Sequence, residues 1–197
     1  TDNIELSKLW RDLLIEHDKK YGSGQEFYFA RQKKASVESK AIKVNKALDH
    51  LFHSAGTDYL APFVNRILEK LYPEMKIEFT RRNITINDWG RVEQFPAINL
   101  QVFEKGVCID AHNPHFALNE ARLSAIAISI FLGAIIKQSP FSPNLKPLFL
   151  DDILIGLDNE NRLKLLNLLK ETDVPEADKV FKDFQIFITT YDRHWYE

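Results

Sequence analysis

The stretch from Lys146 to Asp158 constrains the fold more than any other part of this chain. It reads Lys-Pro-Leu-Phe-Leu-Asp-Asp-Ile-Leu-Ile-Gly-Leu-Asp, so a short apolar run ends in two adjacent carboxylates, Asp151 and Asp152. An apolar run of this length is typical of a strand buried in a parallel sheet. Open α/β sheets bind their ligands outside the carboxyl ends of such strands. The stretch therefore predicts an α/β fold with a candidate site at the two acids.

The segments after this strand support a parallel arrangement. A helical pattern runs from about Asn159 to Lys170, and a second apolar strand reads Gln185-Ile-Phe-Ile-Thr189. Strand, helix and strand in this order predict a parallel βαβ unit. Upstream of it, the strongly apolar segment from Asn119 to Lys137 predicts a buried helix.

The first 74 residues predict a mostly helical arm, or the base of a coiled coil. Apolar residues recur on one face from Ile4 to Lys20, and a second helical region is expected from about Gln25 to Ser54. The Gly-Ser-Gly at 22–24 is either a natural turn or an inserted linker between two helices. Asp58 is expected to cap a third helix, with Pro62 in its first turn.

From Met75 onward, apolar residues recur at every second position, as in a strand, instead of at the spacing of a helix. Alternation at 76–80, 83–87, 97–103 and 107–109 predicts an antiparallel meander with one solvated face. We therefore expect two regions, the helical arm over 1–74 and an α/β lobe over 75–197.

Composition excludes several classes of protein. A net charge of −2 gives no overall basic footprint for nucleic acid, and the single cysteine, Cys108, excludes an internal disulfide. The longest apolar stretch, Leu123 to Ile136, is too short to span a bilayer. The given sequence opens without a positively charged segment before an apolar core, so we expect no secretion signal. We expect a cytoplasmic protein with no membrane partner. Because the chain begins at Thr1 rather than Met, we also expect it to be a piece of a longer protein.

Three segments together resemble a known family. The segment from Leu118 to Leu132 resembles the signature motif and helix of ABC-type ATPases, and Lys146 to Asp158 resembles a Walker B strand with its D-loop. The segment from Gln185 to His194 resembles the last core strand and switch region. In this order they resemble the C-terminal lobe of an SMC/RecF/RecN-like ATPase head. No G-x-x-x-x-G-K-[ST] phosphate loop occurs in the chain.

The resemblance implies roles for the acids and for one tyrosine. Asp151 would hold magnesium, and Asp152 would take the position of the base that polarises the attacking water. Asp158 would be the D-loop acid that contacts the opposite head. Tyr191 would occupy the position of the switch histidine, where a phenol can donate a hydrogen bond but carries no charge near neutral pH.

The resemblance also implies a nucleotide-binding role for the start of the apolar helix. Asn119 stands where the signature serine contacts the γ-phosphate, and its amide can still donate a hydrogen bond. Glu120 and Ala121 replace the two glycines of the motif, and Arg122 follows them. On its own, Asn119 is more often a helix cap than a phosphate contact.

As partners the resemblance implies a Walker A lobe, from the same parent chain or another, and a second ATPase head. ATP and Mg²⁺ would bind only in the complete head, which would act on DNA in repair, chromosome maintenance or anti-phage defence. Two other functions remain open. The chain could be a metal-dependent phosphoesterase using Asp151, Asp152 and Asp158, or a non-catalytic interaction module.

Overall fold

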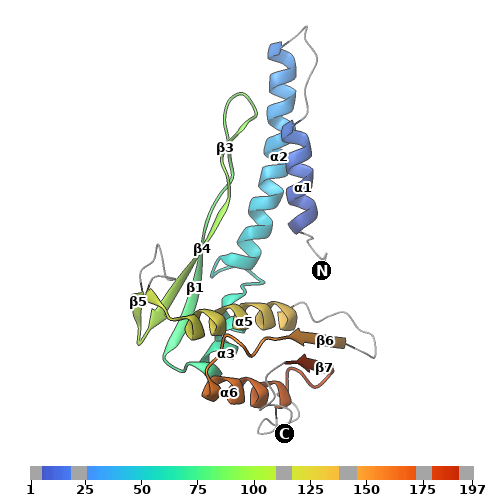
Figure 1. Cartoon of the computed structure of the whole chain (residues 1–197). Coiled ribbons are helices and arrows are strands. Elements are labelled where there is room, and N and C mark those ends of the chain that lie inside the picture. Colours follow the sequence, from blue (N-terminus) through green and yellow to red (C-terminus); the bar gives the residue numbers. More distant parts are fainter. Residues whose placement is uncertain (1–5, 19–25, 110–116, 138–145, 172–178, 191–197) are drawn as a thin grey trace. The chain divides into compact units, whose positions relative to one another are not determined.

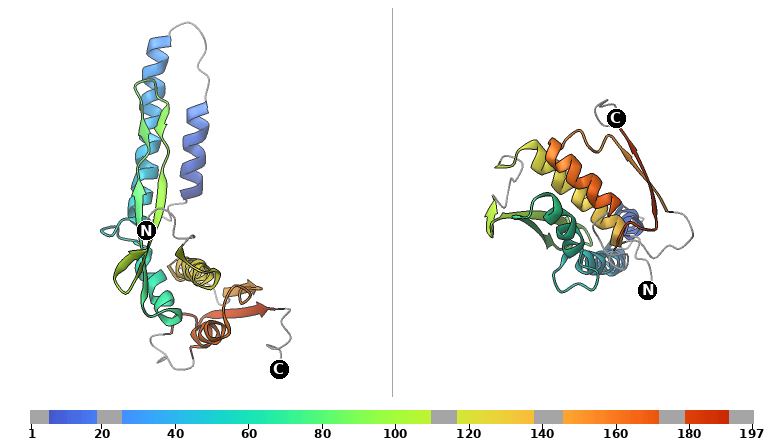
Figure 2. Two further views of the ribbon diagram at one scale, coloured as in Figure 1. Left: turned by 60° about the vertical axis from the view of Figure 1, so that its left-hand side comes forward. Right: turned by 90° about the horizontal axis from the view of Figure 1, so that it is seen from below.

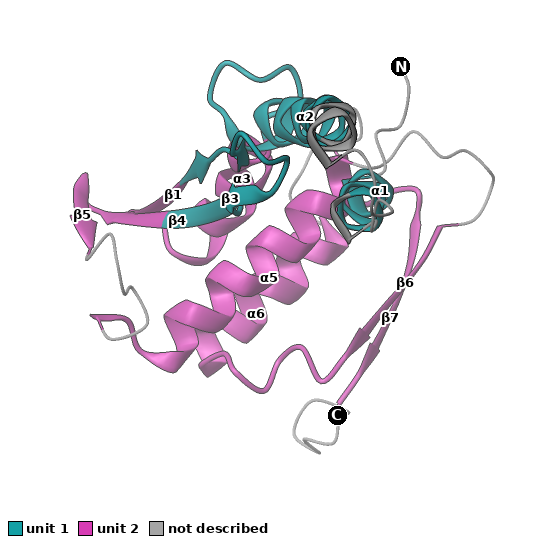
Figure 3. Ribbon diagram, turned by 90° about the horizontal axis from the view of Figure 1, so that it is seen from above, with its two compact units in different colours: residues 1–59, 79–100 teal, residues 60–78, 101–197 magenta. Residues whose placement is uncertain are grey.

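A computed structural model describes residues 6–18, 26–109, 117–137, 146–171 and 179–190. The chain forms two compact units, coloured in Figure 3. The first unit comprises residues 1–59 and 79–100, and the second comprises residues 60–78 and 101–197. The division into regions 1–74 and 75–197 stays a prediction. Among the described residues, no helix is long and apolar enough to cross a membrane.

The first unit is built on two helices that lie side by side in Figures 1 and 2. Helix α1 spans Leu6–Asp18 and helix α2 spans Glu26–Phe52, which confirms both predicted helices. Their shared core contains Leu13 from α1 and Val37, Val44 and Leu48 from α2, all nearly inaccessible to solvent. The Gly-Ser-Gly at 22–24 lies outside the described residues.

The predicted meander is wrong in its strand order. Strands β1 (Met75–Arg82), β4 (Ala97–Glu104) and β5 (Val107–Ile109) form one sheet in the order β1-β4-β5. Strand β2 (Thr85–Ile86) instead pairs antiparallel with β3 (Val92–Gln94) in a separate hairpin. The reason is a tight turn, in which the Asn87 side chain accepts hydrogen bonds from the backbone N–H groups of Trp89 and Arg91.

The second unit contains the predicted parallel pair. Strand β6 spans Lys146–Asp151 and strand β7 spans Phe184–Thr189, and the two are parallel throughout. Helix α6 (Asn159–Lys170) connects them, as predicted. Helix α5 (Glu120–Lys137) confirms the apolar helix, and it packs against α3 (Ala61–Leu71).

Helix α3 begins later than its sequence indicates. Its N-cap residue is Leu60, with no side-chain cap, so the prediction that Asp58 caps this helix is wrong. The Asp58 backbone N–H instead donates to the carbonyl of His50, which extends the turn after α2. Pro62 does lie in the first turn, where its missing N–H removes no helical hydrogen bond.

Candidate functional site

The two acids lie at the carboxyl end of strand β6, as the sequence predicts. The parallel register places Asp151 opposite Thr189, the last residue of β7. The Thr189 hydroxyl donates a hydrogen bond to the Asp151 carboxylate, and both side chains are exposed. No local pattern in the sequence singles out Thr189 as the partner of Asp151, because the pairing depends on the register of the two strands.

Asp152 leaves the strand in a left-handed backbone conformation, with φ of 51°. Aspartate is among the few non-glycine residues that tolerate this conformation. Its backbone N–H donates to the Thr189 carbonyl at 3.1 Å, and its carbonyl accepts from Ile155 at 3.1 Å. These bonds turn the chain sharply at the end of the sheet and fix where the Asp152 carboxylate stands.

One oxygen of the Asp152 carboxylate is buried and has no hydrogen-bond partner among the described residues. A buried carboxylate oxygen left in this state is costly, so native structures usually give it a donor, a water or a cation. Mg²⁺ in nucleotide sites is commonly held by one or two carboxylates together with substrate phosphates. The Asp151 carboxylate, exposed at the end of β6, is the group here that could hold such an ion together with ligands from outside the chain.

The loop after the acids packs tightly onto helix α5. A Cβ added to Gly156 would lie 2.8 Å from the Cβ of Ser124, closer than real atoms approach. On the other side, the Arg162 guanidinium donates to the Leu157 carbonyl at 2.8 Å. The loop that resembles a D-loop is thus fixed between the start of α5 and the first turn of α6.

Asp158 ends this loop as the N-cap of α6. Its carboxylate accepts from the Asn161 backbone N–H at 2.9 Å and from the Tyr72 hydroxyl at 3.3 Å. The Asn161 N–H is the largest cause of a lowered pKa for Asp158. The pKa of Tyr72 is raised, chiefly because the phenol is partly buried and then because of the nearby Asp158 charge. Sequence reasoning missed Tyr72, since no local pattern links residues 86 positions apart.

The start of α5 combines a cap with an ion pair. The Asn119 side-chain oxygen accepts from the Arg122 backbone N–H at 3.0 Å, which leaves the amide NH₂ as a donor. Glu120 is exposed, and Ala121 is half-buried. The Arg122 guanidinium pairs with Glu104 at 2.8 Å, and its central carbon lies 5.9 Å from the centre of the Tyr72 ring. Arg122 therefore binds residues of its own unit, and its predicted contact with nucleotide stays a prediction.

The structure brings only some of the predicted site residues together. Asp151 and Asp152 are adjacent, whereas Asp158 is occupied as a cap. The described part of the chain holds no group of three or more His, Cys, Asp or Glu side chains placed to bind a metal ion. Tyr191 lies outside the described residues, so its predicted role is not tested.

Comparison with known proteins reveals similarity only at the level of structure. No protein-family model matches the chain, and no curated protein matches it. The chain is distantly similar to Smc heads. One is an Smc head bound to the C-winged helix domain of ScpA, with a TM-score of 0.46 and 16% identity over 86% of this chain.

A second is an Smc head domain with an extended coiled coil, bound to the C-terminal domain of ScpA and derived from Pyrococcus furiosus. Its TM-score is 0.46 and its identity 16%, over 94% of this chain. The chain covers 46% of the first structure and 42% of the second, so it spans less than half of either.

The capping role of Asp158 predicts a pH-dependent stability. Replacing Asp158 by Ala should lower the free energy of unfolding by about 0.5–2 kcal/mol, because an N-cap acceptor is lost. Asp158→Asn keeps an acceptor and loses only the charge. The pKa of Asp158 in the folded chain lies below the ordinary aspartate value of 3.8. The stabilisation from its charge is therefore present above pH 3.8 and is lost as the pH falls through the folded pKa.

Thermal unfolding between pH 7 and pH 3 measures this contribution. The difference between wild type and Asp158→Asn should be largest near pH 7 and should shrink as the pH falls toward 3. The same change at the exposed Asp183, which caps no helix, is the matched control. Equal pH dependence in the two variants would contradict the assignment.

Proposed function

We propose that this chain is the C-terminal lobe of an SMC/RecF-like ATPase head. It supplies a Walker B strand, a D-loop, a signature helix and a switch strand to a composite ATP site. Hydrolysis then requires a Walker A lobe, which binds the β- and γ-phosphates, and a second head.

The observation that carries this proposal is the geometry of Asp151 and Asp152. They end a strand of a parallel pair, and one carboxylate oxygen of Asp152 is buried without a donor. Asp151, oriented by the Thr189 hydroxyl, would hold Mg²⁺. The magnesium ion would neutralise charge that develops on the phosphates. Asp152, fixed by its turn, would accept a hydrogen bond from the attacking water and so orient it.

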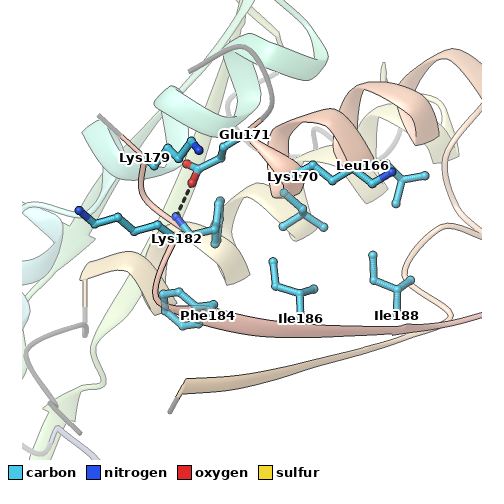
Figure 4. A pocket seen from close by; sticks show the side chains of 10 residues that line it. Leu166, Lys170, Glu171, Lys179, Lys182, Phe184, Ile186 and Ile188 are labelled. Carbon is cyan, nitrogen blue, oxygen red and sulfur yellow. Dashed lines mark hydrogen bonds between the residues drawn. The ribbon is translucent and has the colours of Figure 1, made fainter. Parts of the chain in front are cut away.

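The exposed face of the parallel pair supports the need for a second lobe. Phe149 is 68% exposed, and its ring stacks on that of Phe187 with centroids 4.7 Å apart. Parallel strands are ordinarily covered on both faces, because their connections place helices there. Here side chains of helix α6 face β7 on one side (Figure 4). The stacked rings mark the other side as a surface for further protein.

The start of α5 supports the signature role. The first backbone N–H groups of a helix and its dipole favour a negatively charged ligand. The Asn119 amide adds a donor at the same place, since only its oxygen is used by the cap. In the resembled family this end contacts the nucleotide held by the other head. The second head and the DNA-related pathways, repair, chromosome maintenance or defence, follow from that resemblance.

ATP hydrolysis by a reconstituted head tests the proposal. The chain should be co-expressed with the Walker A lobe encoded with it in the same or a neighbouring gene, and phosphate release measured with ATP and Mg²⁺. Turnover should require both parts. Metal-dependent turnover of a phosphodiester by the chain alone would instead support the phosphoesterase alternative, and absence of turnover in both assays would support an interaction module.

A variant of the exposed face makes this experiment sharper. Phe149→Glu should abolish co-purification with the Walker A lobe but leave the stability of the isolated chain nearly unchanged, because Phe149 is largely exposed. Leu163→Glu is the control, since Leu163 is 54% exposed on helix α6. If both variants retain the partner, the sheet face is not the contact.

A further inference from the structure

A second candidate site lies between helix α6 and strand β7, and neither Asp151 nor Asp152 lines it. It is a cavity of about 440 Å³, within the usual range for ligand pockets. Figure 4 shows side chains of the helix and of the strand facing one another across it. All the residues that line this cavity belong to the second unit.

The periodicity of the two elements gives the cavity its apolar walls. Leu166, Leu169 and Lys170 lie three and four positions apart on α6 and so share a helix face. Every second residue of β7, from Phe184 through Ile186 to Ile188, points to the same side of the strand. The three strand side chains and Leu166 are only half-buried, so apolar surface on both walls remains in contact with solvent.

Lysines surround these walls. Lys170, Lys179 and Lys182 all line the cavity, and Lys170 and Lys182 are exposed. Among the residues that the structure describes, Glu171 is the one carboxylate that lines the cavity, and it is 5% exposed. Its two oxygens accept backbone N–H groups of Val180 and Phe181 at 2.5 and 2.8 Å, so its charge is already stabilised within the wall. Among the described residues, the exposed ammonium groups of Lys170 and Lys182 thus give the cavity a positively charged rim.

We infer that this cavity binds an acidic peptide segment of a partner protein, with apolar side chains between the carboxylates. The leucine and isoleucine walls would take the apolar side chains out of water, and Lys170 and Lys182 would pair with the acids on either side. A ligand without charge would form no ion pairs with the lysines. A ligand without apolar groups would leave the apolar walls of the cavity exposed to water. This inference is independent of the proposed ATPase function, because it uses neither the two acids nor the start of α5.

Fluorescence anisotropy with a designed probe tests the inference. The probe is the labelled peptide Asp-Glu-Leu-Glu-Phe-Asp-Glu, and its uncharged counterpart carries Asn and Gln in place of the acids. The acidic peptide should bind the full chain at least about tenfold more tightly than the uncharged one, and its affinity should fall as salt is raised. Equal affinity for the two peptides, or no binding, would overturn the inference.

Charge reversal on the rim locates the binding. The double variant Lys170→Glu with Lys182→Glu should weaken binding of the acidic peptide at least about tenfold. Both lysines are exposed, so the fold should be retained, and circular dichroism checks this. Lys76→Glu, at an exposed position on β1, is the matched control and should bind like wild type.

A small anionic amphiphile is the competing ligand. Decanoate, titrated as the second ligand, should displace the peptide only weakly. If decanoate binds in a Lys170- and Lys182-dependent manner and the peptide does not, the cavity is a small-molecule site and the inference fails. A loss of peptide binding in the Lys76→Glu control would also overturn the assignment to this cavity.

Discussion

Asp152→Asn should reduce ATP hydrolysis by the complemented head at least about a hundredfold, because the group that accepts a hydrogen bond from the attacking water loses its charge. Asparagine also tolerates the left-handed conformation found at this position, so the turn should be kept. The variant therefore removes the chemistry of the carboxylate without the backbone strain that most other substitutions would add. ATP binding should persist, and phosphate release under single-turnover conditions measures the loss.

The stability of the same variant separates catalysis from folding. The neutral amide costs less to bury without a partner than the charged carboxylate does, so Asp152→Asn should be at least as stable as wild type. Asp152→Ala, which disfavours the left-handed conformation, should be less stable by about 1 kcal/mol. Hydrolysis at the wild-type rate by a well-folded Asp152→Asn head would rule out the assigned role.

Gly156→Ala should destabilise the chain by about 1–3 kcal/mol, because the added methyl group overlaps the side chain of Ser124. Rotation of Ser124 moves its hydroxyl but not its Cβ, which would stand 2.8 Å from the new methyl group. The loop must therefore shift away from helix α5. Because Asp152 and Asp158 flank this loop, the shift should also slow hydrolysis in the complemented head.

A double-mutant cycle with Ser124→Gly checks that mechanism. Glycine at this helical position costs about 1 kcal/mol by itself, but it removes the atoms that collide with the methyl group. The double variant should therefore be more stable than the sum of the two single effects predicts, as measured by urea unfolding. Additive effects would mean that Gly156 is needed for a reason other than its contact with Ser124.

The sequence predicted the parallel βαβ unit well because each part has a strong local pattern. The apolar run before Asp151 and the β-rich run before Thr189 are long enough to be read as strands, and the helix between them has a clear cap at Asp158. The hairpin was harder. Strand β3 covers only Val92–Gln94, too short for an alternating pattern to appear, so the partner of β2 was missed and the strand order was wrong.

The sequence predicted where the two acids of the candidate site lie, but it did not predict the contacts around the site. The positions of Asp151 and Asp152 follow from where a buried strand ends. The bond from Tyr72 to Asp158 and the pairing of Arg122 with Glu104 join residues far apart in sequence. These contacts form only when α3, α5 and β4 pack together in the folded unit, so no sequence motif predicts them. The left-handed turn at Asp152 likewise depends on the backbone bond to Thr189.

Because the parallel sheet has only two described strands, the isolated chain is expected to aggregate during expression. Among the described residues, β6 and β7 hydrogen-bond only to each other, so each has one open edge of backbone donors and acceptors. Open edges next to apolar side chains promote pairing with other chains and aggregation. Co-expression with the lobe that completes the sheet should therefore give a higher yield of soluble, unaggregated protein than expression of the chain alone.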